Sequence, residues 1–173
     1  FNFPKEFIKK NGEFTVNIAL LENNQPVCGV VYAPALQKLY WGSSENGSFK
    51  SINEDTFILI SVNSQVTNPV QIAVSRSHPS IKMKSFISQF DEYDLYPMGS
   101  SLKICYVSDG TVHFYPRLGP TMEWDTAAAH AVLRAAGGEI IKYGTYDPLE
   151  YNKRNLLNPE FIAGNMQNIQ SLK

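Results

Sequence analysis

The stretch WDTAAAHAVLRAAGG, residues 124–138, decides the fold. Its alanines at 127, 128, 131, 135 and 136 predict a helix with one face of small residues, on which another element can pack closely. The pair Gly137-Gly138 is a natural end for such a helix. Asp125 falls in the first turn, where the helix dipole favours a carboxylate. From its spacing alone, this aspartate is either a favourable first-turn acid or part of a site.

Upstream of residue 63 the sequence predicts antiparallel strands, because short runs of β-forming residues are separated by turn signals. Asn23-Asn24-Gln25-Pro26 and Glu45-Asn46-Gly47 are such turns, and the second is typical of a hairpin. We expect strands over residues 13–20, 27–32, 39–41, 48–50 and 57–60.

From residue 70 onward, strand patterns alternate with helix patterns, which favours an α/β class with a largely parallel or mixed sheet. The composition shift over residues 63–69 is a candidate boundary. It would separate residues 1–66, part of an antiparallel first sheet, from residues 67–173, a C-terminal α/β layer with the second sheet. We expect strands over residues 70–74, 93–96, 112–115, 139–141 and 161–163, and helices over residues 80–90, 100–107 and 124–136.

The length and net charge of the chain limit the classes of function that it can have. A chain of 173 residues is long enough for one domain, and its net charge of -1 argues against a nucleic-acid or anionic-membrane binder, which needs a basic excess. A small phosphorylated ligand remains compatible with this charge, because a few converging cations suffice to bind it.

There is no run of 18 apolar residues and no signal-peptide pattern, and nothing supports peripheral association with a membrane. Cys28 and Cys105 lack metal-ligand spacing and are expected to be buried thiols, which fits a reducing cytoplasm.

Gly99-Ser100-Ser101-Leu102-Lys103 lies between a predicted strand and a predicted helix. Free N–H groups, two hydroxyls and a lysine in this position suit a phosphate or a sugar hydroxyl. The segment is not a P-loop, because the GxxxxGK[ST] pattern is absent. The alternative is an ordinary helix cap followed by a solvated lysine.

Ser75-Arg76-Ser77-His78 follows a buried strand, and Arg117 ends another, so both lie where α/β sheets commonly bind ligands. Glu123 is either a second acid beside Asp125 or a surface residue.

Nucleophilic catalysis finds little support, because no GxSxG elbow is present and the histidines are dispersed. His113 is expected to be packed or at a sheet edge, and His130 to face away from Asp125. No catalytic residue is assigned.

Together these segments resemble the inositol-monophosphatase superfamily, most closely its CysQ-type 3'(2'),5'-bisphosphate nucleotidases. The WDxAA run marks the superfamily, and GSSLK, SRSH and NGEFTVNIAL point to the nucleotidase branch. The resemblance extends from Lys5 to about Phe161 and implies the α+β layered sandwich of the sugar phosphatases. The matching runs are residues 5–9, 11–20, 29–34, 75–78, 99–103, 115–117 and 124–128.

The resemblance implies hydrolysis of adenosine 3',5'-bisphosphate to AMP and phosphate, a step tied to sulfate assimilation. Magnesium would clamp the phosphate, and lithium typically inhibits the family. Asp125 matches the family's metal-binding aspartate, which also lies close to the nucleotide. The alternatives are an inositol or sugar phosphate phosphatase and a non-catalytic nucleotide-binding remnant. The expected substrate-binding residues are Ser75, His78, Gly99, Ser101, Lys103, Arg117 and Asp125.

One departure from the family pattern matters. The family carries DPLDGT immediately before its KEF run, with a metal-binding Glu some twenty residues earlier, whereas here Phe1-Asn2-Phe3-Pro4 precedes Lys5. We therefore expect a fold that is incomplete at the N-terminus, with one carboxylate that cannot hold a catalytic Mg²⁺ cluster and little activity of its own. Helices that cover the first sheet in the family would be missing as well. The bare apolar strand faces would then favour self-association.

Overall fold

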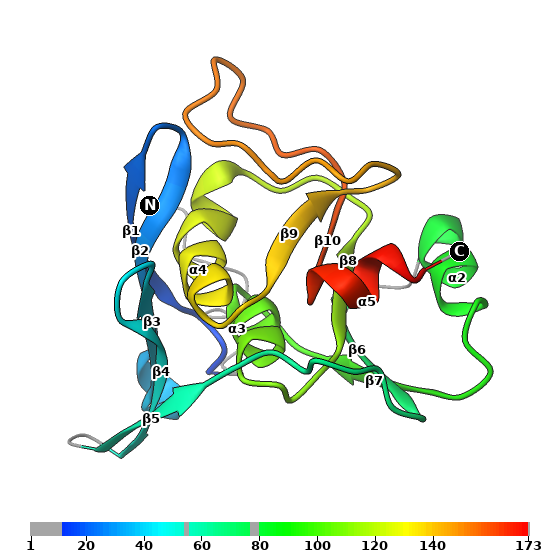
Figure 1. Cartoon of the computed structure of the whole chain (residues 1–173), viewed down its shortest axis with the longest axis horizontal. Helices are drawn as coiled ribbons and strands as arrows, with labels where there is room; N and C mark the ends of the chain where they lie inside the picture. Colours follow the sequence, from blue (N-terminus) through cyan, green and yellow to red (C-terminus); the bar gives the residue numbers. More distant parts are fainter. Residues whose placement is uncertain (1–11, 54–55, 77–79, 173) are drawn as a thin grey trace.

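Two five-stranded sheets and the helices beside them form successive layers in the computed structural model, which describes residues 12–53, 56–76 and 80–172 (Figure 1). Sheet A is a meander in which neighbours in sequence pair antiparallel. A short 3-10 helix, η1 (Pro34–Leu36), joins its second and third strands. The strands are β1 (Val16–Glu22), β2 (Gln25–Ala33), β3 (Lys38–Ser43), β4 (Gly47–Asn53) and β5 (Thr56–Ile60).

Sheet B has the order β7-β6-β8-β10-β9. Its first three strands are parallel, and β10 runs antiparallel to both of its neighbours. The sheet is therefore mixed, and the α/β layered class predicted from the sequence is confirmed. The strands are β6 (Val70–Val74), β7 (Tyr93–Pro97), β8 (Phe114–Arg117), β9 (Glu139–Lys142) and β10 (Phe161–Gly164); the helices are α2 (Ile81–Ile87), α3 (Leu102–Ser108), α4 (Glu123–Ala135) and α5 (Met166–Gln170).

Helix α4 lies against sheet A with almost no side chain between the two backbones. A Cβ atom placed on Gly29 of β2 would lie 2.1 Å from the Ala128 carbonyl oxygen, and one on Gly42 of β3 would lie 2.9 Å from the Ala135 Cβ. Glycine on the sheet and alanine on the helix thus permit this approach. The small-residue face predicted for residues 124–136 is the face that contacts the sheet.

The two sheets share one hydrophobic core. Val31 and Tyr40 of sheet A belong to the same buried cluster as Leu133 of α4 and Phe161 of sheet B. A second cluster lies on the other side of sheet B, where α2 contributes Phe86. Sheet A and sheet B thus pack on the first of these clusters together, and the division of the chain at residues 66 and 67 stays a prediction. No helix in the described part of the chain is long and apolar enough to cross a membrane.

The two cysteines differ in their surroundings. Cys105 on α3 is fully buried, and burial raises the pKa of its thiol. Cys28 is only half-buried, so the expectation of two buried thiols is wrong for this residue. The reason is strand alternation, because Cys28 pairs with Leu20 on the face of sheet A that points away from α4.

We predict that Gly29→Ala lowers the free energy of unfolding by about 3 kcal/mol, because the added methyl forces α4 off the sheet. Urea unfolding followed by circular dichroism measures this loss. Gly119→Ala is the control, since a Cβ there meets no atom within 4 Å. It should change stability by less than about 0.5 kcal/mol. Equal losses for the two variants would contradict the packing described for α4.

Candidate functional site

Four chain segments converge beside the carboxyl ends of β6 and β8. Ser75 follows β6, Arg117 ends β8, Lys103 lies at the start of α3 and Asp125 lies in the first turn of α4. Arg117 Nη1 donates to Ser75 Oγ at 2.8 Å, and Lys103 Nζ lies 5.4 Å from the centre of the Tyr115 ring. The residues that sequence analysis assigned from separate segments are thus brought together.

Tyr115 of β8 is the centre of this cluster, and sequence analysis did not assign it a role. Its side chain is buried, and this burial raises the pKa of the phenol to about 12. The charge of Arg117 and hydrogen bonds with Ser75 and Arg117 limit the rise, whereas the Asp125 carboxylate adds to it. Tyr115 is therefore a neutral phenol that positions its neighbours.

Lys103 is buried, so the alternative of a solvated lysine is wrong. Only 6% of the residue is exposed, and Nζ donates to the carbonyl oxygens of Ser100 at 2.7 Å and Met98 at 3.3 Å. A buried ammonium group requires such acceptors because it loses its water shell. The carbonyl groups of the segment before α3 thus hold the ammonium group of Lys103 in place, so that a cation lies at the site.

The start of β1 contributes two polar residues that sequence analysis missed, Thr15 just before the strand and Asn17 within it. The Thr15 hydroxyl hydrogen-bonds to the hydroxyls of Ser100 and Ser101, the latter at 2.9 Å. Ser101 Oγ also donates to Asn17 Oδ1 at 2.7 Å, and it makes no cap bond to α3. Ser101 is therefore a link between the layers rather than an ordinary helix cap.

Glu13 joins the two loops that were expected to bind the ligand. One carboxylate oxygen accepts from the Gly99 N–H at 2.6 Å, and the other pairs with Arg76. The N–H of Gly99 is thus engaged within the protein. Residues 77–79 lie outside the described residues, so the expected role of His78 stays a prediction.

Asp125 serves the helix and remains exposed. Its Oδ2 accepts from the Met122 N–H at 2.9 Å, which caps α4. In the described part of the chain no three His, Cys, Asp or Glu side chains lie together as metal ligands. Mg²⁺ in phosphoryl-transfer sites takes one or two protein carboxylates together with phosphate and water oxygens. Asp125, exposed in the first turn of α4, can supply one such carboxylate.

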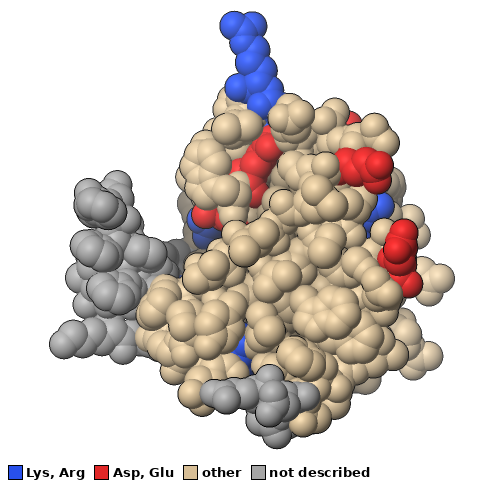
Figure 2. Space-filling view, turned by 90° about the vertical axis from the view of Figure 1, so that its left-hand side faces the viewer, with Lys and Arg blue, Asp and Glu red and all other residues tan. Residues whose placement is uncertain are grey.

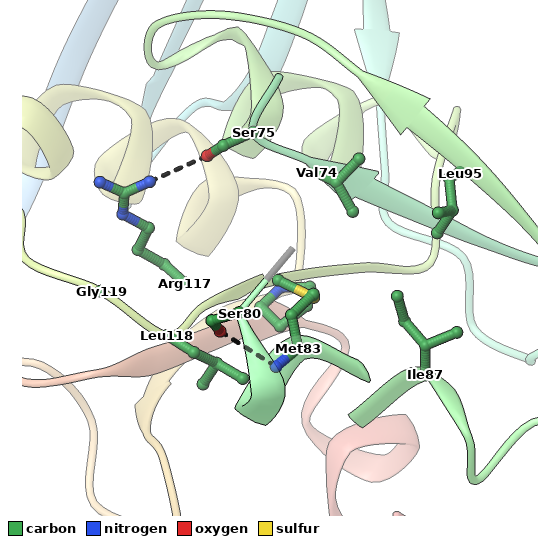
Figure 3. A pocket seen from close by; sticks show the side chains of 10 residues that line it. Val74, Ser75, Ser80, Met83, Ile87, Leu95, Arg117, Leu118 and Gly119 are labelled. Carbon is green, nitrogen blue, oxygen red and sulfur yellow. Dashed lines mark hydrogen bonds between the residues drawn. The ribbon is translucent and has the colours of Figure 1, made fainter. Parts of the chain in front are cut away.

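A cavity of about 180 Å³ opens beside Ser75 and Arg117 (Figure 3). Figure 3 shows the hydrogen-bonded Ser75 and Arg117 on one side, with Met83 and Ile87 of α2 across from them. Arg117 Nε is buried without a hydrogen-bond partner among the described residues. The cavity thus combines apolar walls with a cation at its edge.

Glu123 is neither a second site acid nor a surface residue. Its buried carboxylate accepts from the N–H groups of Asn152 at 2.7 Å and Lys153 at 3.2 Å, and from Lys153 Nζ at 2.5 Å. Burial acts to raise its pKa, but these hydrogen bonds and the Lys153 charge outweigh it and lower the pKa below its usual value. Glu123 therefore ties the loop between β9 and β10 to α4.

The two described histidines lie outside the cluster. His113 is packed rather than edge-exposed, and its Nδ1 lies 3.0 Å from the Gln71 nitrogen. His130 is fully buried, with Nδ1 2.8 Å from the Tyr151 hydroxyl and Nε2 paired with Glu139. Burial lowers the pKa of both imidazoles. The expectation that His130 does not share the site with Asp125 agrees with these contacts.

The fold and this cluster define a member of a known phosphatase family. Residues 4–172 match the inositol monophosphatase family, and the chain belongs to it.

Its relatives point to one branch of that family. The chain is 43% identical over 158 residues to the 3'(2'),5'-bisphosphate nucleotidase CysQ of Escherichia coli K12 and 34% identical over 160 residues to the protein of that name from Haemophilus influenzae. Each match covers 91% of this chain but only 62% and 59% of those relatives.

Solved structures agree with this relationship. CysQ from Bacteroides thetaiotaomicron matches with a TM-score of 0.84 at 41% identity, covering 94% of this chain and 66% of that one. A staphylococcal IMPase-II matches with a TM-score of 0.77 at 19% identity, covering 96% of this chain and 62% of that one. The second likeness shows the fold alone.

We predict that Glu123→Gln lowers the free energy of unfolding by about 2 kcal/mol at pH 7, because the charged acceptor is lost. The folded-state pKa of Glu123 is lowered, so its stabilisation is present above the unfolded pKa of about 4.3 and is lost as the pH falls through the folded value. The difference from wild type should accordingly shrink below about pH 4. Thermal unfolding across pH measures it.

Glu150→Gln is the matched control, because the Glu150 side chain is 59% exposed. It should change stability by less than about 0.5 kcal/mol at either pH. A pH-independent loss for Glu123→Gln would show that the carboxylate charge is not what stabilises the loop.

Proposed function

We propose that this chain forms the nucleotide-binding part of a phosphatase that removes the 3'-phosphate of adenosine 3',5'-bisphosphate. The observation that carries the proposal is the cluster of Lys103, Tyr115, Arg117 and Ser75 beside Asp125. Its support is the 43% identity to a 3'(2'),5'-bisphosphate nucleotidase over a segment that includes these residues.

The charges suit a phosphorylated nucleotide. Lys103 and Arg117 bring two cations to one site, and a guanidinium binds phosphate through two parallel hydrogen bonds. Ser75 and Ser101 add hydroxyls, and we expect Gly99 and His78 to complete the contacts. The small net charge of -1 is consistent with one concentrated anion site rather than a basic surface.

The cavity favours a nucleotide over an inositol or sugar phosphate. Its walls are apolar and include Val74, Met83, Ile87 and Leu118. An inositol or sugar ring would bury its hydroxyls against these walls without hydrogen bonds, which is unfavourable. A purine base has two apolar faces and polar edges, and the Arg117 side chain is among the residues that line the cavity. The adjoining cations would then bind the phosphates of the same molecule.

Magnesium, when bound, would neutralise the phosphoryl oxygens and activate the attacking water. We propose that Asp125 is one of its ligands and that lithium inhibits, in a cytoplasmic step of sulfur metabolism. In the described residues no three His, Cys, Asp or Glu side chains are grouped as ligands for this ion. The described residues therefore bind and orient the nucleotide, through Lys103, Arg117 and the hydroxyls.

We predict that Arg117→Gln weakens binding of adenosine 3',5'-bisphosphate at least about tenfold, because a charged hydrogen bond to phosphate is lost. Isothermal titration calorimetry measures the affinity, with inositol 1-phosphate as the competing ligand class. Arg154→Gln is the control, since Arg154 is exposed and outside the cluster. Equal affinities for the two variants would contradict the site.

Phosphate release on the same ligands separates binding from catalysis. We expect nucleotide binding without Mg²⁺ and little turnover with it, because no three His, Cys, Asp or Glu side chains of the described residues lie together as ligands for the ion. Turnover of the nucleotide comparable to that of Escherichia coli CysQ would show that this chain holds a working metal site. Preferential release from inositol 1-phosphate or fructose 1,6-bisphosphate would favour the sugar phosphatase alternative.

A further inference from the structure

We propose that Glu13, shortly before β1, is a positioning residue that holds both cations of the candidate site in place for the nucleotide. The inference rests on the proposed function, because it assigns to Glu13 a role in nucleotide binding. Glu13 belongs to the stretch that leads into sheet A, whereas Lys103 and Arg117 belong to α3 and β8. Its carboxylate acts on them through two intermediates, Gly99 and Arg76.

The first connection is made through one peptide group. Glu13 Oε2 accepts from the Gly99 N–H at 2.6 Å. The planar peptide that carries this N–H also carries the Met98 carbonyl oxygen, which points the opposite way and accepts from Lys103 Nζ at 3.3 Å. Because the peptide is rigid, a carboxylate that holds its N–H also fixes the direction of its carbonyl. Glu13 thus orients an acceptor of the buried ammonium group.

The second acceptor of Lys103 lies in the same short segment. The Ser100 carbonyl oxygen accepts from Lys103 Nζ at 2.7 Å, and Ser100 has a φ of +53°, in the left-handed region that residues other than glycine rarely adopt. Such a conformation persists only where the surrounding contacts hold it. Glu13 binds the residue before Ser100, and the Thr15 hydroxyl binds the Ser100 side chain. The segment that holds Lys103 therefore depends on contacts from the stretch before β1.

A spacing in the sequence explains why one stretch makes these contacts. Glu13, Thr15 and Asn17 are two residues apart, so in an extended chain their side chains point to the same side. All three hydrogen-bond to residues 99–101. Glu13 is the charged member of this row, so it can also hold the guanidinium of Arg76.

The second connection is made through Arg76. Its guanidinium pairs with Glu13 Oε1. The parallel pairing of β6 with β7 ends one residue before Ser75, and beyond that point Glu13 joins the loop after β6 to the loop after β7. Ser75 is the neighbour of Arg76, and its hydroxyl accepts from Arg117 Nη1 at 2.8 Å. Holding Arg76 therefore also holds the partner of the second cation.

The charges of this pair are partly shielded from solvent. Figure 2, which views the molecule from the sheet A side, shows few charged side chains on that face. The Glu13 side chain is 15% exposed and the Arg76 side chain is 43% exposed. Salt screens partly buried charges less than exposed ones, so it weakens this pair less than it weakens a surface pair.

The alternative role for Glu13 is that of a competitor. A carboxylate bound to a backbone N–H and a guanidinium occupies donors that also suit a phosphate. Competition and positioning differ in sign when the carboxylate is removed. Competition predicts tighter nucleotide binding, whereas positioning predicts weaker binding, because the ligand must then order both loops itself. The contacts from Glu13 through the peptide of Gly99 to Lys103 favour positioning.

Isothermal titration calorimetry with adenosine 3',5'-bisphosphate decides between these roles. We expect Glu13→Ala to weaken binding about tenfold or more, because binding then includes the ordering of both loops. Glu13→Gln should weaken it less, because the amide oxygen still accepts from the Gly99 N–H. Glu150→Ala is the control, since Glu150 also pairs with a lysine, Lys142, but lies on the loop between β9 and β10. Unchanged or tighter binding by Glu13→Ala would overturn the proposal.

A double-mutant cycle separates positioning from a direct contact of Arg76 with the ligand. Arg76→Ala should weaken binding about threefold in the wild-type chain and change it little when residue 13 is already alanine, because Arg76 acts through Glu13. The fitted stoichiometry and the circular dichroism of each variant guard against a folding defect. An equal loss in the two backgrounds would show that Arg76 acts independently of Glu13 and would overturn the proposal.

Amide hydrogen exchange tests the same contacts without ligand. Glu13→Ala should speed exchange of the Gly99 amide at least about tenfold, because its acceptor is lost. The amide shifts of Ser75, Arg76 and residues 99–103 should change with it. A wild-type chain that binds no nucleotide would refute the proposed function, and these data would still decide whether Glu13 holds both loops. Unchanged exchange at Gly99, or shifts confined to one loop, would overturn the inference.

Discussion

The direct contact between the backbone of α4 and sheet A is the constraint on which the rest of the structure depends. Gly29 and Gly42 leave room for Ala128 and Ala135, so the helix axis is held close to the sheet at two points. Because interiors are close-packed, a helix held in this way cannot slide or tilt without opening voids. The first turn of α4, and with it Asp125, is therefore fixed relative to both sheets.

Polar contacts connect the two sheets to the candidate site. Thr15 and Asn17 come from the start of sheet A, yet they hydrogen-bond to Ser101 at the start of α3. Glu13 likewise joins the Gly99 segment to Arg76, which follows β6. The cluster around Tyr115 thus requires both sheets, which is consistent with their single core.

Local patterns accounted for much of the fold and part of the site. Alternation and turn residues placed the strands to within a few residues, and the alanine spacing identified α4 and its packing face. Short sequence segments identified Ser75, Lys103, Arg117 and Asp125 as candidate site residues. Their assignment as ligand contacts depended on a family resemblance, because none of these segments is specific alone.

Contacts between distant segments could not be read from the sequence. Thr15 and Ser101 are 86 positions apart, and no local pattern links them. The burial of Lys103 depends on its own loop turning back around it, and the role of Glu123 depends on a loop some thirty residues away. The prediction for Cys28 was wrong because its apolar neighbours in sequence suggested a core strand. In the structure α4 packs on one face of sheet A, and Cys28 points to the other face.

Amide chemical shifts, measured by two-dimensional NMR during titration with adenosine 3',5'-bisphosphate, test most directly the claim that these segments form one ligand site. The account predicts that the largest shifts fall together on Ser75, residues 99–103, Arg117 and Asp125, with little change along β3 and β4. Shifts confined to one of these segments, or concentrated on sheet A away from Thr15, would contradict it.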